Sequence, residues 1–178
     1  MNIYDELTKD HRAVIGLLDK LISQADASAE TRNGLIEQIR DELVPHSRAE
    51  EAVFYNSLRE IPEIKSMVMH GYAEHMEAET LLRTLQVTGK VDAGWRTTAQ
   101  KLRDALEHHI QEEEGEIFTA AKQVLAKEEA DLIGQAFVEM KPQIKEQGLM
   151  GTTVDMIANM LPQRFASAFK NFAVSTKH

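Results

Sequence analysis

The chain has 178 residues, of which 43% are hydrophobic and 28% are charged, and this composition favours one globular domain over a disordered chain. Its 20 basic and 29 acidic residues give a net charge of -9, which disfavours nucleic acid as a partner. The absence of cysteine excludes disulfides and thiolate-ligated metal centres, so any bound metal must take nitrogen and oxygen ligands.

Abundant helix-forming residues, only four prolines and the absence of strand-type alternation predict an all-α protein. The first helix is expected over about residues 2–24, with Asn2 as its N-cap, and residues 26–34 have the composition of a turn. The second helix is expected to continue to about residue 60. Pro45 lies inside it and is expected to bend it.

The third helix is expected over about residues 62–87, and the fourth over about residues 92–124. A shorter fifth helix, over about residues 127–140, is expected to end before Pro142. Four long amphipathic helices joined by short turns predict an antiparallel up-down-up-down four-helix bundle, with extra helical segments at its C-terminal end.

The last part of the chain, residues 148–178, differs in composition from the expected bundle, residues 1–147. It is mildly basic and contains Phe165, Phe169 and Phe172. We expect a helical tail that packs on the bundle or on a second subunit of a homodimer; docking on a membrane surface is the alternative. No run is apolar enough for a membrane helix and the first residues are acidic, so we expect a cytoplasmic protein.

Each of the four long helices places a histidine in its apolar stripe, and on three of them a glutamate follows four residues later. Such a pair lies on one face of a helix. A single inward histidine is usually a hydrogen-bonded core residue, but several buried carboxylates without a basic partner are costly unless cations neutralise them. The candidate metal ligands are His11, His46, Glu50, His75, Glu79, His109 and Glu113.

Imidazole and carboxylate ligands without thiolate favour iron or manganese, with zinc as a further option, in a mononuclear or polynuclear site. For two octahedral ions, the candidate donors fall short of a complete set. This shortfall indicates a reactive site that is open to an exogenous ligand.

Four motifs stand in this order along about residues 1–140: TKDHRAV, LVPHSRAEEAVFY, AEHMEAETLL and LEHHIQEEEGEIF. Together they resemble the hemerythrin-like or HHE cation-binding domain. The resemblance implies an antiparallel four-helix bundle that holds two iron ions, bridged by oxo or hydroxo and carboxylate groups, with zinc or manganese less favoured. The family's ligand positions match His11, His46, Glu50, His75, His109 and Glu113.

Two departures separate this chain from the oxygen-carrying hemerythrins. Those carriers have HxxxH on the third helix, whereas this chain has Gly71 before His75 and Glu79 after it. They end the site with HxxxxD, whereas this chain has His109 and Glu113. A histidine is lost and carboxylate is gained, which favours ferric iron and disfavours reversible oxygen carriage.

The leading hypothesis is therefore a di-iron protein that binds or reacts with a small oxidant or gas, such as peroxide, oxygen or nitric oxide, in the context of oxidative stress. Catalase-like peroxide decomposition is the candidate enzymatic activity. The alternatives are metal sequestration without turnover and an interaction protein whose metal state is the signal.

Other polar residues near these positions are expected to lie outside the ligand set. His70 is rotated by about 140° from the ligand face, and His108 is one residue off it, so both are expected at the surface or beside ligands. Tyr55 and Tyr72 are candidates for a phenolate ligand or a redox relay, or for ordinary packing. Solvated acidic faces are expected for Glu51, Glu112, Glu114 and Glu116, with Glu51 as a candidate additional ligand.

Overall fold

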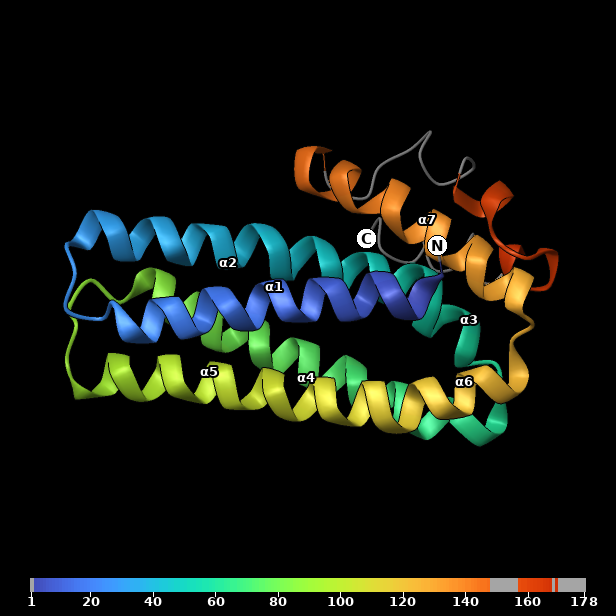
Figure 1. Cartoon of the computed structure of the whole chain (residues 1–178), viewed down its shortest axis with the longest axis horizontal. Helices are drawn as coiled ribbons and strands as arrows, with labels where there is room; N and C mark the ends of the chain where they lie inside the picture. Colours follow the sequence, from blue (N-terminus) through green and yellow to red (C-terminus); the bar gives the residue numbers. More distant parts are fainter. Residues whose placement is uncertain (1, 148–156, 168, 170–178) are drawn as a thin grey trace.

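The computed structural model describes residues 2–147, 157–167 and 169, which are mainly helical and contain no strand. The prediction of an all-α protein is confirmed. Four long helices lie along the long axis of the molecule (Figure 1). In the part of the chain that is described, no helix combines the length and the apolar character needed to cross a membrane. The long helices are α1 (Ile3–Ser23), α2 (Ala29–Glu50), α4 (Pro62–Val87) and α5 (Ala93–Glu112).

The other helical segments continue these four helices or, in the case of one helix of 21 residues, cover them. Two π-helical segments, η1 (Glu51–Tyr55) and η2 (Glu113–Ile117), follow α2 and α5 directly. The remaining helices are α3 (Asn56–Leu58), α6 (Phe118–Val124) and α7 (Lys127–Gln147), and α7 packs against α1 and α2. Figure 1 shows α7 beside the start of α1.

Side-chain caps explain where the first two helices begin. The Asn2 side chain accepts a hydrogen bond from the third residue of α1, as predicted. Ser28 caps α2, because its Oγ accepts a hydrogen bond of 3.2 Å from the backbone N–H of Thr31. The prediction of a turn over residues 26–34 is therefore wrong in its second half, where a serine cap starts the helix at Ala29.

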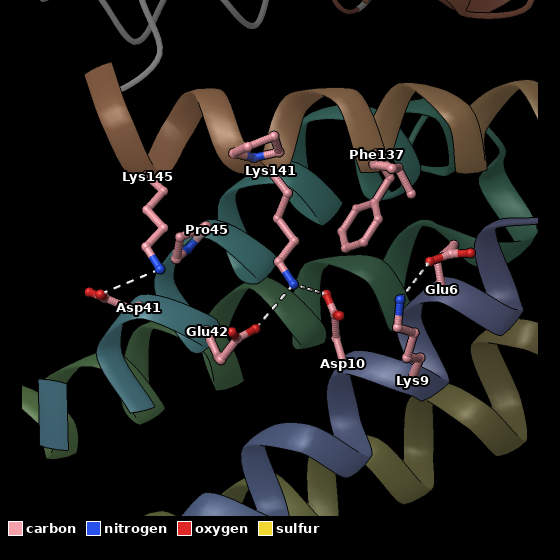
Figure 2. Close-up of a pocket in the computed structure, with 11 residues that line it drawn as sticks. Glu6, Lys9, Asp10, Asp41, Glu42, Pro45, Phe137, Lys141 and Lys145 are labelled. Carbon is pink, nitrogen blue, oxygen red and sulfur yellow. Dashed lines mark hydrogen bonds and ion pairs between the residues drawn. The ribbon is translucent and has the colours of Figure 1, made fainter. Parts of the chain in front are cut away.

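Two prolines lie inside helices. The helix α2 continues through Pro45, and α7 continues through Pro142, so the prediction that the fifth helix ends before Pro142 is wrong. Contacts with other helices hold α7 in place at this point. Lys141 Nζ lies 2.6 Å from Asp10 Oδ2 and 3.3 Å from Glu42 Oε2 (Figure 2). Together with the buried Phe137 and Met140, these ion pairs hold α7 on α1 and α2 although Pro142 donates no backbone hydrogen bond.

The two π-helical segments interrupt the predicted second and fourth helices at equivalent places. The segment η1 begins immediately after Glu50, and η2 begins at Glu113. A π-turn inserts one residue into a helix and is frequently found at functional sites. An unbroken period of 3.6 residues does not contain such an insertion, which shifts the apolar pattern of all later residues by one position.

A layer of polar side chains divides the core into two apolar clusters. On α1, Ile3 and Leu7 belong to the larger cluster, Val14 and Leu18 belong to the smaller one, and His11 lies between them. The same succession recurs on α4 and, in the reverse direction, on α2 and along α5 with η2, where the larger cluster begins at Ile117. The polar layer consists of His11, His46, Glu50, His75, His109 and Glu113, all of which are buried.

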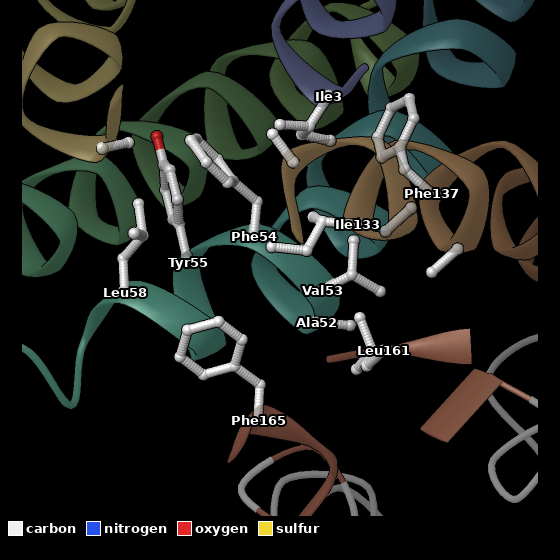
Figure 3. Packing of buried hydrophobic residues seen from close by; sticks show 14 of the residues in the cluster. Ile3, Ala52, Val53, Phe54, Tyr55, Leu58, Ile133, Phe137, Leu161 and Phe165 are labelled. Atoms are coloured by element: carbon white, nitrogen blue, oxygen red, sulfur yellow. The ribbon is translucent and has the colours of Figure 1, made fainter. Parts of the chain in front are cut away.

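The described part of the C-terminal tail packs on the larger cluster. Leu161, Phe165 and Phe169 are buried there, and Figure 3 shows Leu161 and Phe165 beside the side chains of η1. Phe172 lies outside the described residues. The division of the chain at residue 147 and a homodimer formed through the tail remain predictions.

Substitution of Gly134 tests how closely α7 approaches the start of α1. A Cβ atom at this position would lie 2.7 Å from the backbone carbonyl carbon of Asn2 and 2.7 Å from the backbone nitrogen of Ile3. We expect Gly134→Ala to lower the free energy of unfolding by about 2 kcal/mol, because backbone must move to admit the methyl group.

The matched control is Gly16→Ala on α1, where nothing lies within 4 Å of the added methyl group. It should raise the free energy of unfolding by about 0.5–1 kcal/mol, since alanine favours helix over glycine. Urea denaturation measures both variants, and equal effects would contradict the close packing of α7.

Candidate metal centre

The carboxylate of Glu50 lies between histidines from two helices. Its Oε2 atom is 3.3 Å from His46 Nε2, one turn earlier on α2, and 3.4 Å from His75 Nε2 on α4. The Nε2 atoms of His75 and His109 are 3.0 Å apart. Two groups of potential ligands therefore share Glu50: one with His11 and His46, the other with His75 and His109.

The carboxylate of Glu113 contacts the other two histidines, His11 and His109. Its Oε2 atom is 3.1 Å from His11 Nε2 on α1 and 4.0 Å from His109 Nε2, one turn earlier on α5. Each carboxylate thus contacts one histidine of each group. This is the arrangement expected of two carboxylates that bridge two neighbouring metal ions.

Several inner atoms of this cluster have no hydrogen-bond partner. Glu50 and Glu113 are both 0% exposed, and none of their four oxygen atoms is hydrogen-bonded. His11 Nε2 is likewise buried without a partner. Among the described residues, the buried polar set contains no Lys or Arg. Unpaired buried carboxylates are costly, so these donor atoms fit bound cations.

Each of the four histidines uses its other ring nitrogen, Nδ1, to contact a carboxylate outside the cluster. A neutral imidazole that donates from Nδ1 presents the Nε2 lone pair to a metal, and the carboxylate fixes the ring orientation. The four contacts are His46 with Asp10 at 3.1 Å, His75 with Glu51 at 3.1 Å, His109 with Glu74 at 2.9 Å and His11 with Glu114 at 2.9 Å.

These four outer carboxylates form a closed ring around the helices. Asp10 on α1 contacts a histidine of α2, Glu51 at the end of α2 contacts one of α4, Glu74 on α4 contacts one of α5, and Glu114 contacts one of α1. Each outer carboxylate also adjoins in the chain a member of the polar layer. We define this set as the outer carboxylate ring.

Sequence reasoning missed the outer carboxylate ring. Glu51 was expected on a solvated acidic face or as a further ligand, but it is buried. Its Oε1 atom contacts His75 Nδ1, and its Oε2 atom accepts a hydrogen bond from Arg48. Glu114 is partly exposed and contacts His11. The signal that would have found the ring is an acidic residue immediately beside a candidate ligand on every long helix.

Glu79 lies apart from the other candidate ligands. Its Oε2 atom accepts a hydrogen bond of 2.8 Å from Arg48, and its side chain is 24% exposed, whereas Glu50 and Glu113 are completely buried. The structure therefore brings together six of the seven candidate residues. As expected, His70 and His108 are exposed at the surface.

Burial dominates the electrostatics of the imidazoles. Burial lowers the pKa of His46 to about 4, and burial together with the His109 charge lowers the pKa of His75 to about 3. Burial alone would also lower the pKa of His11, but its close contacts with the carboxylates of Glu113 and Glu114 raise it above the usual value. His46 and His75 are consequently neutral at pH 7 and able to bind a metal through nitrogen.

The two inner carboxylates titrate as a pair. Burial, followed by the charge of Glu113, raises the pKa of Glu50 well above its usual value. Burial acts on Glu113 in the same direction, but its close contacts with Glu50 and with the His11 imidazole outweigh it and lower the pKa of Glu113. Without a cation, one carboxyl of the pair thus retains a proton at neutral pH.

Tyr55 occupies space that Gly71 leaves open beside the cluster. A Cβ atom on residue 71 would lie 2.5 Å from the Tyr55 hydroxyl oxygen, so any larger residue there would displace the phenol. The Tyr55 ring stacks on His75 with centroids 5.5 Å apart, and its buried hydroxyl has no hydrogen-bond partner. Tyr72 instead donates a hydrogen bond to the backbone carbonyl of Glu51.

Comparisons with known proteins bear on the same residues. The family model described as the hemerythrin HHE cation binding domain matches residues 2–121. The chain is 26% identical over 152 residues to a Nostoc protein named DNA nickase, a match that covers 83% of this chain but only 41% of that protein. It is 29% identical over 120 residues to uncharacterized proteins of Mycobacterium bovis and Mycobacterium tuberculosis, covering 67% of this chain and 72% of each relative. No solved structure matches the chain.

A neutral substitution of Glu50 tests whether the cluster is strained without a cation. We expect Glu50→Gln to raise the free energy of unfolding of the metal-free protein at pH 7 by about 1–3 kcal/mol, because glutamine is neutral without the proton that the buried Glu50 must take up on folding at this pH. Because the pKa of Glu50 is raised on folding, the metal-free parent protein loses stability as the pH rises from the ordinary pKa of a glutamate toward the raised pKa of Glu50. The variant should lose that part of the pH dependence.

Thermal and urea unfolding at a series of pH values, after treatment with a chelator, measure this effect. Glu37→Gln on the exposed face of α2 is the control and should change stability by less than about 0.5 kcal/mol. If Glu50→Gln instead destabilises the metal-free protein, the two inner carboxylates are not a cation site held under strain.

Proposed function

The chain belongs to the family of hemerythrin HHE cation-binding domains, and from that premise we propose that its core binds two iron ions that meet a small oxidant or gas. The observation that carries the proposal is the pair of inner carboxylates, Glu50 and Glu113, which contact all four histidine Nε2 atoms. In this proposal α1, α2, α4 and α5 form an up-down-up-down bundle, supported by the alternating order of the two apolar clusters along them.

The donor set supports two ions with open positions. Four imidazole nitrogens and four carboxylate oxygens supply about eight bonds, against about twelve for two six-coordinate ions. Carboxylates are hard, anionic ligands that stabilise the ferric state. Iron bound here would supply redox chemistry and Lewis acidity.

The protein's own groups prepare the site in three ways. The outer carboxylate ring holds each imidazole with Nε2 facing inward. Phe54, Ile117 and Phe118 form apolar packing in the cluster next to the site and exclude water. Phe137 of α7 covers His46, with ring centroids 5.7 Å apart.

The Tyr55 hydroxyl is the hydrogen-bond donor of the proposed site. Burial and the nearby charges of Glu113 and Glu50 raise its pKa well above the usual value, so the phenol keeps its proton at neutral pH. It lies beside Gly71, one turn before His75, on the helix that lacks the HxxxH pair of the oxygen carriers. A hydrogen-bond donor to a small oxidant, in place of a further histidine ligand, favours reaction with peroxide over reversible oxygen carriage.

Iron loading tests the stoichiometry. Anaerobic titration of the metal-free protein with Fe²⁺ should end at two ions per chain, and admission of air should then produce the near-ultraviolet charge-transfer absorption of coupled ferric ions. Glu113→Ala should lose at least half of this iron, because it removes a bridging ligand. Glu79→Gln should keep all of it, since Arg48 holds Glu79 away from the cluster. A parent stoichiometry of one iron would falsify the dinuclear site.

Sequestration of iron without turnover is the second candidate, and the complete burial of Glu50 and Glu113 favours it. The rate of peroxide loss separates the two functions. A reactive centre consumes peroxide faster than free iron at equal concentration, whereas a storage site does not. A cytoplasmic location remains a prediction for either function.

Tyr55→Phe tests this hydrogen-bond donor in the same assay. We expect the variant to bind iron as the parent does and to consume peroxide about tenfold more slowly, because the loss of one positioned hydrogen-bond donor costs at least that much. Tyr4→Phe is the control, since Tyr4 also has a buried hydroxyl without a partner but packs against Phe54 and Phe118 in the larger cluster. Equal losses of rate in both variants would contradict a specific role for Tyr55.

A further inference from the structure

Two histidines and two glutamates converge at the surface where α4 and α5 pack together. His70 and Glu74 are four residues apart on α4, and His108 and Glu112 are four residues apart on α5. Each pair repeats the spacing of the core pairs, but on the outer face of its helix. We propose that these four side chains form a second site, at the surface, for a divalent first-row transition-metal ion.

The distances among the four side chains suit one small cation. His70 Nε2 lies 3.3 Å from Glu112 Oε2 and 3.6 Å from Glu74 Oε1. His108 Nε2 lies 3.1 Å from Glu112 Oε1 and 3.9 Å from Glu74 Oε1. One donor atom from each residue lies within 4.8 Å of those of the other three. Tetrahedral zinc with bonds of about 2.1 Å separates its ligand atoms by about 3.4 Å, within the span of these distances.

The negative charge around these four side chains also favours a bound cation. Glu74 and Glu112 have no ion pair with Lys or Arg in the described part of the chain; their partners are histidines. The adjoining surface pocket adds a third carboxylate, Glu116, and no basic residue other than His70. With neutral imidazoles, the group carries an uncompensated negative charge and two exposed nitrogen ligands.

Access distinguishes this site from the core. The side chains of His70 and His108 are 59% and 63% exposed, so a cation reaches them from solvent without any opening of the helices. Two nitrogen and two oxygen donors without thiolate match zinc and its first-row neighbours, and match magnesium or calcium poorly. Bulk water is available to complete the coordination.

Glu74 connects the surface site to the core. Its Oε1 atom faces the two surface histidines, whereas its Oε2 atom accepts the hydrogen bond from His109 Nδ1 at 2.9 Å. One carboxylate therefore belongs both to the outer carboxylate ring and to the surface site. The surface site is thus a separate cation position built against the core centre, and not a part of it.

Zinc binding to the full chain tests the proposal. Isothermal titration with Zn²⁺, with elemental analysis after gel filtration, should show one more zinc per chain for the parent than for the His70→Ala/His108→Ala double variant. Each single variant should weaken this binding at least tenfold. The test measures the difference in bound zinc between the parent and the double variant, so its result does not depend on whether the core is loaded with iron.

Glu77→Gln is the matched control, since it removes an exposed carboxylate from α4 outside the cluster and should bind zinc as the parent does. Co²⁺ gives a second readout: the parent should show visible absorption from a cobalt ion with low coordination number that the double variant lacks. The circular dichroism of the double variant should match the parent, because both substituted side chains are exposed. Equal zinc stoichiometry and affinity in the parent and the double variant would overturn the proposal and leave only histidine–glutamate ion pairs.

Discussion

Two carboxylates that are fully buried and have no hydrogen-bond partner constrain everything else in this molecule. Glu50 and Glu113 lie at the centre of the helices, and among the described residues no buried Lys or Arg neutralises them. Four imidazoles face them, and the outer carboxylate ring orients those imidazoles from behind. Such an arrangement is unfavourable by itself and becomes favourable when cations bind, so metal binding and folding are coupled.

The apolar clusters on either side of the polar layer offset the free-energy cost of burying it. They bury the leucines, isoleucines and aromatic rings of the long helices above and below the polar layer, and each large side chain contributes about 1.5–3 kcal/mol. The two π-helical segments begin at or next to the inner glutamates, where regular helix gives way to a wider turn. Apolar packing thus stabilises the fold away from the site, and the unfavourable buried charges are concentrated at the site, as expected of a functional centre.

Much of this arrangement is predictable from helical periodicity. His11 replaces an apolar residue at a stripe position of α1, and the HxxxE pairs at His46 and His109 do so on α2 and α5, so their burial follows from spacing alone. The outer carboxylate ring and the Gly71–Tyr55 contact are not predictable in this way, because they join different helices and depend on relative rotation. Glu79 occupies a similar face of α4, but a salt bridge to Arg48 holds it outside. Pro142 does not end its helix because the packing of α7 on the other helices outweighs local propensity.

Anomalous X-ray diffraction at the iron absorption edge, from crystals of the protein as isolated, tests the central claim most directly. The account predicts two peaks in the space between Glu50 and Glu113, one beside the Nε2 atoms of His11 and His46 and the other beside those of His75 and His109. A single peak, or none between the two carboxylates, would contradict it.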